Sequence, residues 1–156
     1  ALKRYAGHPL FVLASLKTFF MDFDRKRPHF SLQFENGHTV DEGYFSVVMN
    51  TNPYTYLGNR PLDLVPSTKL ETGLSVVTFK TMNPQHILRT LASALKGGGI
   101  KQKPWLDIQT NIKEVTASDA RAFPYQLDGD YLGEVREVTF EYVPDALRLV
   151  RSHPPL

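Results

Sequence analysis

The residues best suited to chemistry lie in one short stretch, 123–134, which has the sequence FPYQLDGDYLGE. It contains three carboxylates, Asp128, Asp130 and Glu134, and an Asp-Gly pair, which is a strong signal for a two-residue turn. Asp128 and Asp130 are two positions apart, so on an extended backbone both side chains would lie on the same face. Two such carboxylates could bind a metal or accept a proton, although the pattern alone favours a solvated turn.

The metal chemistry open to this chain is narrow. A calcium-binding EF-hand starting at Asp128 needs an oxygen ligand at its fifth position and Glu at its twelfth, where the chain has Leu132 and Thr139. The five histidines are scattered without paired spacing, which argues against a zinc site built from them. The absence of cysteine excludes thiolate ligands and cysteine nucleophiles. We therefore predict no metal site and no tightly bound cofactor.

Nucleotide binding has no visible motif either. Gly97-Gly98-Gly99 follows a predicted helix, whereas a phosphate-binding loop precedes one so that the helix N-terminal amides face the anion. These glycines are interpreted as a helix C-cap and hinge. No serine lies in a nucleophile elbow. A glycosidase that pairs Asp128 with Asp130 or Glu134 stays conceivable, but two neighbouring acids do not define an acid and a base.

Composition bounds the class of protein. With 156 residues, 42% of them hydrophobic, the chain can bury a core, and one domain covering residues 1–156 is expected. A net charge of only +2 argues against a nucleic-acid partner. No apolar run approaches the roughly 18 residues of a membrane span, and no signal peptide is recognised. The chain opens at Ala1 without an initiator Met, so we expect a processed piece or a fragment of a longer protein. The expected location is the cytoplasm.

Two helices are predicted. Residues 10–21 combine a broad apolar face with a narrow polar stripe, which favours a buried helix; the basic cluster 25–27 supports an interfacial membrane helix as the alternative. The second helix starts with Asn83 as N-cap and Pro84 at its first position. Its expected core residues are Ile87, Leu88, Leu91 and Leu95.

The rest of the chain has strand character with frequent turns. Residues 30–35 alternate and lead into Asn36-Gly37, which predicts a type I′ hairpin. Residues 44–50 are too apolar to face water and are expected at the centre of a sheet. Further strands are expected over 74–80, 106–117, 121–127 and 137–142, with a turn at Ser118-Asp119, and 147–150 closes the domain. The expected fold is mainly β (α+β): an antiparallel β-sandwich with one or two packed helices.

A long irregular segment, 51–67, separates two of these strands and carries Tyr54, Tyr56 and Leu57. Long loops with aromatic residues are often functional, although packing beneath the loop is the commoner reason for such residues. These three residues are the candidates for contact with a substrate or a lipid.

Three parts of the chain resemble the diacylglycerol kinase-like lipid kinases, a family that includes sphingosine kinases and related bacterial enzymes. Residues 125–134, followed by 138–140 and 143–150, resemble the C-terminal Asp-Gly-Asp/Glu motif, its short spacer and a strand that closes on Pro-x-Ala-Leu. Residues 50–58 are similar to the loop after the family's central strand. Residues 66–74 resemble its proline, spacer and acidic-glycine turn.

The resemblance implies a two-domain enzyme, in which this chain is the C-terminal β-sandwich and a nucleotide-binding domain belongs elsewhere on the polypeptide. It implies that Asp128 is the general base for a lipid hydroxyl and that Asp130 helps to organise the site, with ATP and Mg²⁺ bound in the complete enzyme. It also implies a lipid substrate and transient contact with a membrane surface, so that the protein can lie peripherally on it. Without the other domain the chain is not expected to be active, and an exposed interdomain face could allow homo-oligomers.

One departure from the family concerns a structural metal that some members bind through aspartates in the acidic-glycine turn. Here that turn is Glu71-Thr72-Gly73, with one acid, so no such site is predicted. Two alternatives remain open: a non-catalytic lipid- or protein-binding sandwich that uses residues 54–57, and a stand-alone carbohydrate hydrolase, which would need a third acid in a cleft.

Overall fold

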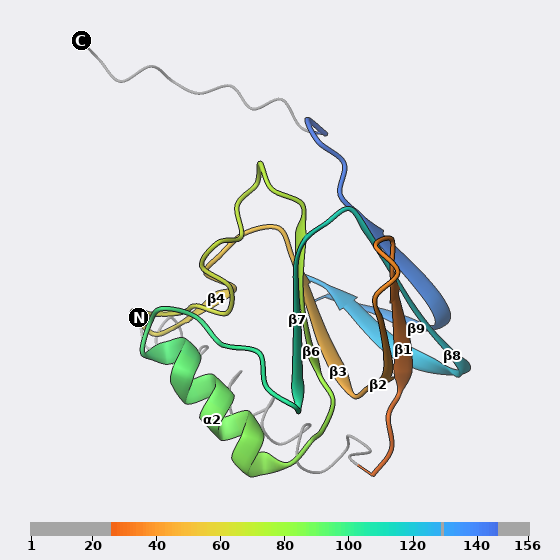
Figure 1. Ribbon diagram of the computed structural model, residues 1–156, viewed down its shortest axis with the longest axis horizontal. Coiled ribbons are helices and arrows are strands. Elements are labelled where there is room, and N and C mark those ends of the chain that lie inside the picture. Colours follow the sequence, from red (N-terminus) through yellow and green to blue (C-terminus); the bar gives the residue numbers. More distant parts are fainter. Residues whose placement is uncertain (1–25, 129, 147–156) are drawn as a thin grey trace, which may run out of the picture.

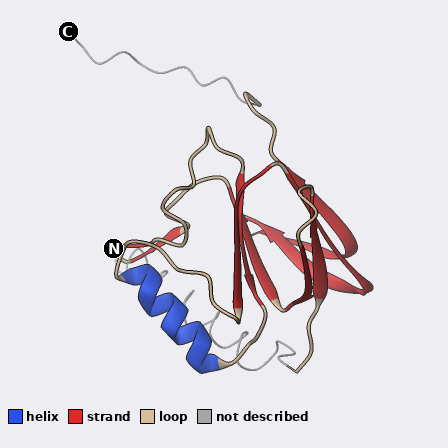
Figure 2. Ribbon diagram, viewed as in Figure 1, coloured by secondary structure: helices blue, strands red, loops and turns tan. Residues whose placement is uncertain are grey.

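The computed structural model describes residues 26–128 and 130–146. Within them the fold is mainly β with one helix, as predicted (Figures 1 and 2). The strands are β1 Phe30–Phe34, β2 Thr39–Gly43, β3 Phe45–Met49, β4 Thr55–Leu57, β5 Arg60–Leu62, β6 Leu74–Phe79, β7 Leu106–Ile112, β8 Glu114–Leu127 and β9 Asp130–Glu141, and the helix is α2 Pro84–Leu95.

The strands form two packed antiparallel sheets and a separate small hairpin, β4–β5. The first sheet has the order β2-β1-β8-β9 and the second has the order β3-β6-β7. Between them lies a core of buried apolar side chains: Leu32, Phe34, Val40, Leu74, Val76, Ile112, Val115, Ala117 and Phe123. Burial of one such Val or Leu side chain contributes about 1.5–3 kcal/mol to folding, so this core fixes how the sheets stack. The predicted sandwich is confirmed.

The central strand of the second sheet is β6, whose six residues are all buried. The expectation that residues 44–50 form a central strand is wrong, because β3 pairs only with β6 and lies at the edge of the sheet. Its apolar character has another cause. Val47 and Met49 pack toward the helix, whereas Val48 packs against the core between the sheets.

Helix α2 covers the face of the second sheet that points away from the first, which gives three layers (Figure 1). The Asn83 side chain accepts a hydrogen bond from the Gln85 amide at 2.9 Å, and Pro84 opens the helix, so the predicted start is confirmed. The three glycines after the C-cap all have positive φ, which agrees with their C-cap assignment. Leu88 was wrongly placed in the core: it is 59% exposed, and the buried residues are Thr90 and Ala94.

Two of the turns predicted from the sequence have a different geometry in the structure. At Asn36-Gly37 only the glycine has positive φ, and Gly37 N donates to Phe34 O, so the hairpin has a three-residue loop with a glycine bulge instead of a type I′ turn. At Ser118-Asp119 the chain does not turn back. Strand β8 continues through these residues, and its register with β9 shifts between Ser118 and Phe123.

Side chains of the β1–β2 turn, which belongs to the first sheet, contact β7 of the second sheet and the connection from β7 to β8. The Glu35 carboxylate accepts hydrogen bonds from the Lys113 and Glu114 amides, at 2.8 and 3.3 Å, where β7 passes into β8. His38 Nε2 lies 3.2 Å from both oxygens of the buried Asp107 carboxylate on β7. These contacts attach the β1–β2 turn both to the start of β7 and to the connection from β7 to β8.

Several expectations fall outside the described residues. The helix over 10–21, its membrane-surface alternative with the full basic cluster, and the closing segment 147–150 all belong to this group.

Candidate functional site

The Asp-Gly motif lies at the end of a two-stranded arm. Strand β1 pairs with β8 only from Val115 to Ser118, so from Phe123 onward β8 pairs with β9 alone. Leu127 pairs with Asp130, which leaves two residues for the turn, and Asp128 has a φ of 51°. The predicted two-residue turn is therefore confirmed; Gly129 itself is outside the described residues.

This geometry changes the expected relation between the two aspartates. A shared face requires an extended backbone, but Asp128 adopts the left-handed conformation of the turn while Asp130 is the first residue of β9. The expectation of a common strand face is wrong for that reason. Both side chains are exposed, so each carboxylate is accessible to a ligand from solvent.

The irregular segment 51–67 contains a small hairpin that strand propensity did not predict. Strands β4 and β5 pair through Thr55–Leu62 and Leu57–Arg60, and Gly58 in their turn has a φ of 62°. The Tyr54 amide adds one more bond, to Leu62 O. The hairpin thus presents Tyr56 and Leu57 close to its turn.

Asn52 anchors this hairpin to the helix-side core. Its Oδ1 accepts hydrogen bonds from the Leu64 and Val65 amides, at 3.1 and 3.2 Å, and its Nδ2 donates to Asp63 at 3.0 Å. Leu64 and Val65 are buried beneath α2 with Ala94. One side chain therefore satisfies two backbone donors at the base of the hairpin, and the peptide bond that follows it, Asn52-Pro53, is cis.

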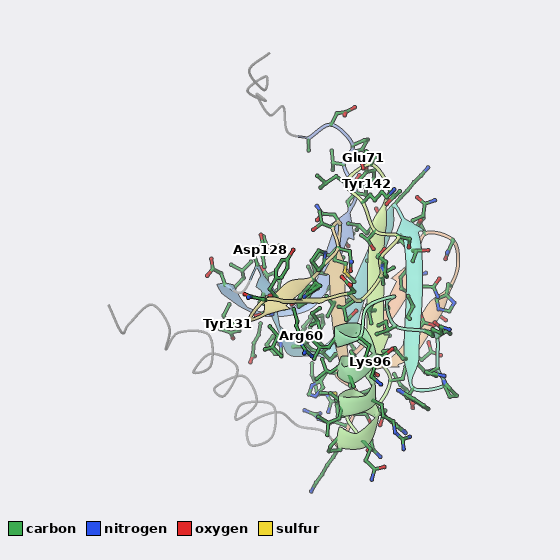
Figure 3. All side chains as sticks on the ribbon, turned by 90° about the vertical axis from the view of Figure 1, so that its left-hand side faces the viewer. Arg60, Glu71, Lys96, Asp128, Tyr131 and Tyr142 are labelled. Carbon is green, nitrogen blue, oxygen red and sulfur yellow. The ribbon has the colours of Figure 1, made fainter. Side chains whose placement is uncertain are left out.

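The structure brings the two sets of sequence candidates together. Tyr54, at the base of the β4–β5 hairpin, is 43% exposed; burial and, second, the negative charge of Asp128 raise the pKa of its phenol. Figure 3 shows Asp128, Tyr131 and Arg60 on the same side of the molecule, where both hairpins project from the sandwich. The β4–β5 hairpin and the Asp-Gly turn are far apart in the sequence but project to the same side of the molecule, and together they form one candidate site.

Three further apolar residues at this site were missed: Leu127, Tyr131 and Leu132, which are at least half exposed. They flank the Asp-Gly-Asp turn in the sequence, where Leu127 is expected only as a strand residue and Tyr131 and Leu132 only as part of the motif. The available signal was the two-residue turn itself, because apolar residues directly beside such a turn lie at a hairpin tip, beyond the reach of a sheet core.

The metal-binding capacity of the site is limited. Within residues 26–128 and 130–146 no group of three or more His, Cys, Asp or Glu side chains is placed to hold a metal ion. The acidic-glycine turn lies elsewhere, at the end of the molecule where the Tyr142 hydroxyl donates to Leu70 O at 2.9 Å (Figure 3). A carbohydrate hydrolase would need a third acid in a cleft beside Asp128 and Asp130.

Comparisons of the chain with models of protein families, with curated proteins and with solved structures found no match. None of the helices in the described part of the chain has the length and apolar character needed to cross a bilayer.

Proposed function

We propose that this chain is the acceptor-lipid domain of an ATP-dependent lipid kinase that phosphorylates the hydroxyl of a diacylglycerol-like or sphingoid lipid. The observation that carries the proposal is the placement of Asp128: an exposed carboxylate at the outermost turn of the arm, on the side of the molecule to which the β4–β5 hairpin also projects (Figure 3). The resemblance of residues 125–134 to the Asp-Gly-Asp/Glu motif supports the same assignment.

In the proposed reaction the Asp128 carboxylate accepts the proton of the lipid hydroxyl. The hydroxyl oxygen then forms a bond to the γ-phosphorus of ATP, the bond between that phosphorus and the β,γ-bridging oxygen breaks, and ADP leaves. Phosphoryl transfer depends mainly on positioning and on neutralisation of charge, so an accessible base on a rigid hairpin is a suitable contribution from one domain.

The nucleotide must come from a second domain of the same polypeptide, because this chain has no phosphate-binding loop. Mg²⁺ would arrive with the nucleotide phosphates, and Asp130 is proposed to add one carboxylate oxygen to the organisation of that ion. We propose a cytoplasmic enzyme that contacts the membrane peripherally, which is where a lipid hydroxyl is found.

A non-catalytic lipid- or protein-binding sandwich is the second candidate, favoured by the exposure of Tyr56 and Leu57 on the β4–β5 hairpin. Substitution of Asp128 distinguishes the two functions. If the domain only binds, Asp128→Asn leaves both ligand binding and any activity of the complete polypeptide unchanged.

The test is phosphate transfer from labelled ATP to lipid, measured with the isolated chain and with the complete two-domain polypeptide. The proposal expects no transfer by the isolated chain, transfer by the complete polypeptide, and loss of that transfer in its Asp128→Asn variant with the fold intact. Transfer by the isolated chain, or none by the complete polypeptide with either class of lipid, would overturn it.

A further inference from the structure

The apolar residues exposed on the described part of the chain are concentrated on the two hairpins. Of its ten exposed large hydrophobic residues, six lie there; one is Tyr54. The other five are named here the hairpin rim and are between 47% and 66% exposed: Tyr56, Leu57, Leu127, Tyr131 and Leu132. Scattered exposed apolar residues are ordinary, but a cluster on two projecting tips indicates a contact surface.

The arm is built to project beyond the sandwich. Because β1 ends its pairing with β8 at Ser118, the segment from Phe123 to Val135 has no third strand beside it. Figure 3 shows the arm and the β4–β5 hairpin extending to the same side of the molecule. The rim is therefore a pair of protruding tips, and such tips can enter a soft surface without a complementary groove in the partner.

We infer that the hairpin rim docks onto a lipid bilayer, with its Tyr and Leu side chains inserted among the headgroups. This inference rests on the proposed function, because a base that acts on a membrane lipid must reach the headgroup layer, and Asp128 lies between Leu127 and the strand that carries Tyr131 and Leu132. Tyrosine suits this depth, since its ring is apolar and its hydroxyl stays hydrated.

The charges at the rim determine which bilayer it fits. Asp128 and Asp130 lie on the tip of the arm, and Arg60 is the basic residue of the β4–β5 hairpin. Their sum is negative, so anionic lipid would repel the rim. Docking must then come from apolar insertion into neutral lipid and does not need the electrostatic attraction that many peripheral proteins use.

The experiment is co-sedimentation of the full chain with phosphatidylcholine vesicles. The variants are Tyr131→Ser/Leu132→Ser and Tyr56→Ser/Leu57→Ser, and the controls are Leu70→Ser and Leu88→Ser, whose side chains are equally exposed (58% and 59%) but lie off the rim. Because insertion energy scales with buried apolar area, each rim variant is expected to bind roughly tenfold more weakly. The controls should bind like the wild-type chain, and thermal unfolding should be unchanged in all variants.

Salt and anionic lipid give a second, independent readout. Raised salt should leave the binding intact, and replacing part of the phosphatidylcholine by phosphatidylglycerol should not strengthen it. The inference is overturned if rim variants bind as the wild type does, if the wild type does not bind, if the controls lose binding equally, or if binding requires anionic lipid. Loss of self-association in place of vesicle binding would likewise assign the rim to a second copy of the chain and overturn it.

Experiments can refute the docking inference and the kinase assignment independently of each other. Asp128→Asn should not weaken vesicle binding, because it removes a charge that opposes docking. In the complete polypeptide, transfer to a short-chain, water-soluble acceptor should need Asp128 but not the rim residues Tyr131 and Leu132. Transfer that depends on Asp128 without any rim-dependent binding would refute only the docking; rim-dependent binding without such transfer would refute only the kinase assignment.

Discussion

Asp128 and Tyr54 lie within electrostatic range of each other, although one belongs to the β8–β9 turn and the other to the base of the β4–β5 hairpin. Burial is the larger cause of the raised pKa of the Tyr54 phenol, and the Asp128 charge adds to it. This relationship joins the proposed base to the proposed lipid-contact hairpin, and it exists in the chain without any second domain.

The first prediction concerns that coupling. Asp128→Asn should lower the pKa of Tyr54 but leave it above its ordinary value of 10.0, because the contribution from burial remains. Ultraviolet titration of tyrosine ionisation, with Tyr54→Phe used to identify the Tyr54 signal, measures it. Asp130→Asn is the control and should have no effect; an unchanged Tyr54 pKa in Asp128→Asn would show that the two residues are not coupled.

Asn52→Ala should destabilise the fold by about 2 kcal/mol, because two backbone donors at the base of the β4–β5 hairpin lose their acceptor. Urea unfolding measures this cost. The matched control is Asn36→Ala, which removes a single exposed bond from the His38 amide and should cost less than about 1 kcal/mol. Equal costs for the two variants would contradict the anchoring role of Asn52.

Glu35 should make stability depend on acid pH. Slight burial raises the pKa of Glu35, but hydrogen bonds from the Lys113 and Glu114 amides outweigh it and lower the pKa below its ordinary value of 4.5. A folded-state pKa below the unfolded one stabilises the protein above the unfolded value, and this contribution is lost as the pH falls.

The corresponding variant is Glu35→Gln, which cannot ionise. Its unfolding free energy should fall short of the wild-type value at neutral pH, and the difference should shrink at acid pH, as the pH falls through the lowered folded-state pKa and the wild-type carboxylate takes up a proton. Urea unfolding at both pH values measures it. A difference that is independent of pH would show that the charge of Glu35 does not contribute.

Gly73→Ala tests the close approach of the acidic-glycine turn to β7. A Cβ at this position would lie 2.6 Å from the Ile112 carbonyl oxygen, so the backbone must shift, at a cost of about 2–3 kcal/mol. Gly97→Ala is the comparison: its Cβ would meet no atom within 4 Å, and only its φ of 79° opposes the change, at about 1 kcal/mol. Thermal or urea unfolding distinguishes the two, and the reverse order of costs would contradict the steric explanation.

Sequence reasoning predicted several local features, although the turn type at Asn36-Gly37 and the turn at Ser118-Asp119 were wrong. Hydrophobic alternation and turn residues predicted the antiparallel sandwich, and Asn83-Pro84 predicted the start of α2, because caps and turns depend on nearest neighbours. The central position assigned to residues 44–50 was wrong, since apolar content cannot distinguish an edge strand packed on both faces from a central one.

The site was only partly predictable. Asp128, Asp130 and the group 54–57 were selected from residue type and resemblance, but their proximity depends on where the arm and the β4–β5 hairpin project, which is a tertiary property. Strand alternation does not reveal that β8 extends beyond the residues paired with β1. For this reason the exposure of Leu127, Tyr131 and Leu132 was not predicted.

The most direct test of the central claim is the turnover number of Asp128→Asn in the complete polypeptide of the proposed lipid kinase. Asn tolerates the left-handed conformation of the turn, so the fold should persist, and the loss of a general base should lower turnover roughly 10²–10⁴-fold. Asp145→Asn is the matched control, since Asp145 is also exposed and has a φ of 55°. Turnover reduced in Asp128→Asn alone is the predicted result; near-normal turnover in that variant would contradict the assignment of Asp128 as the base.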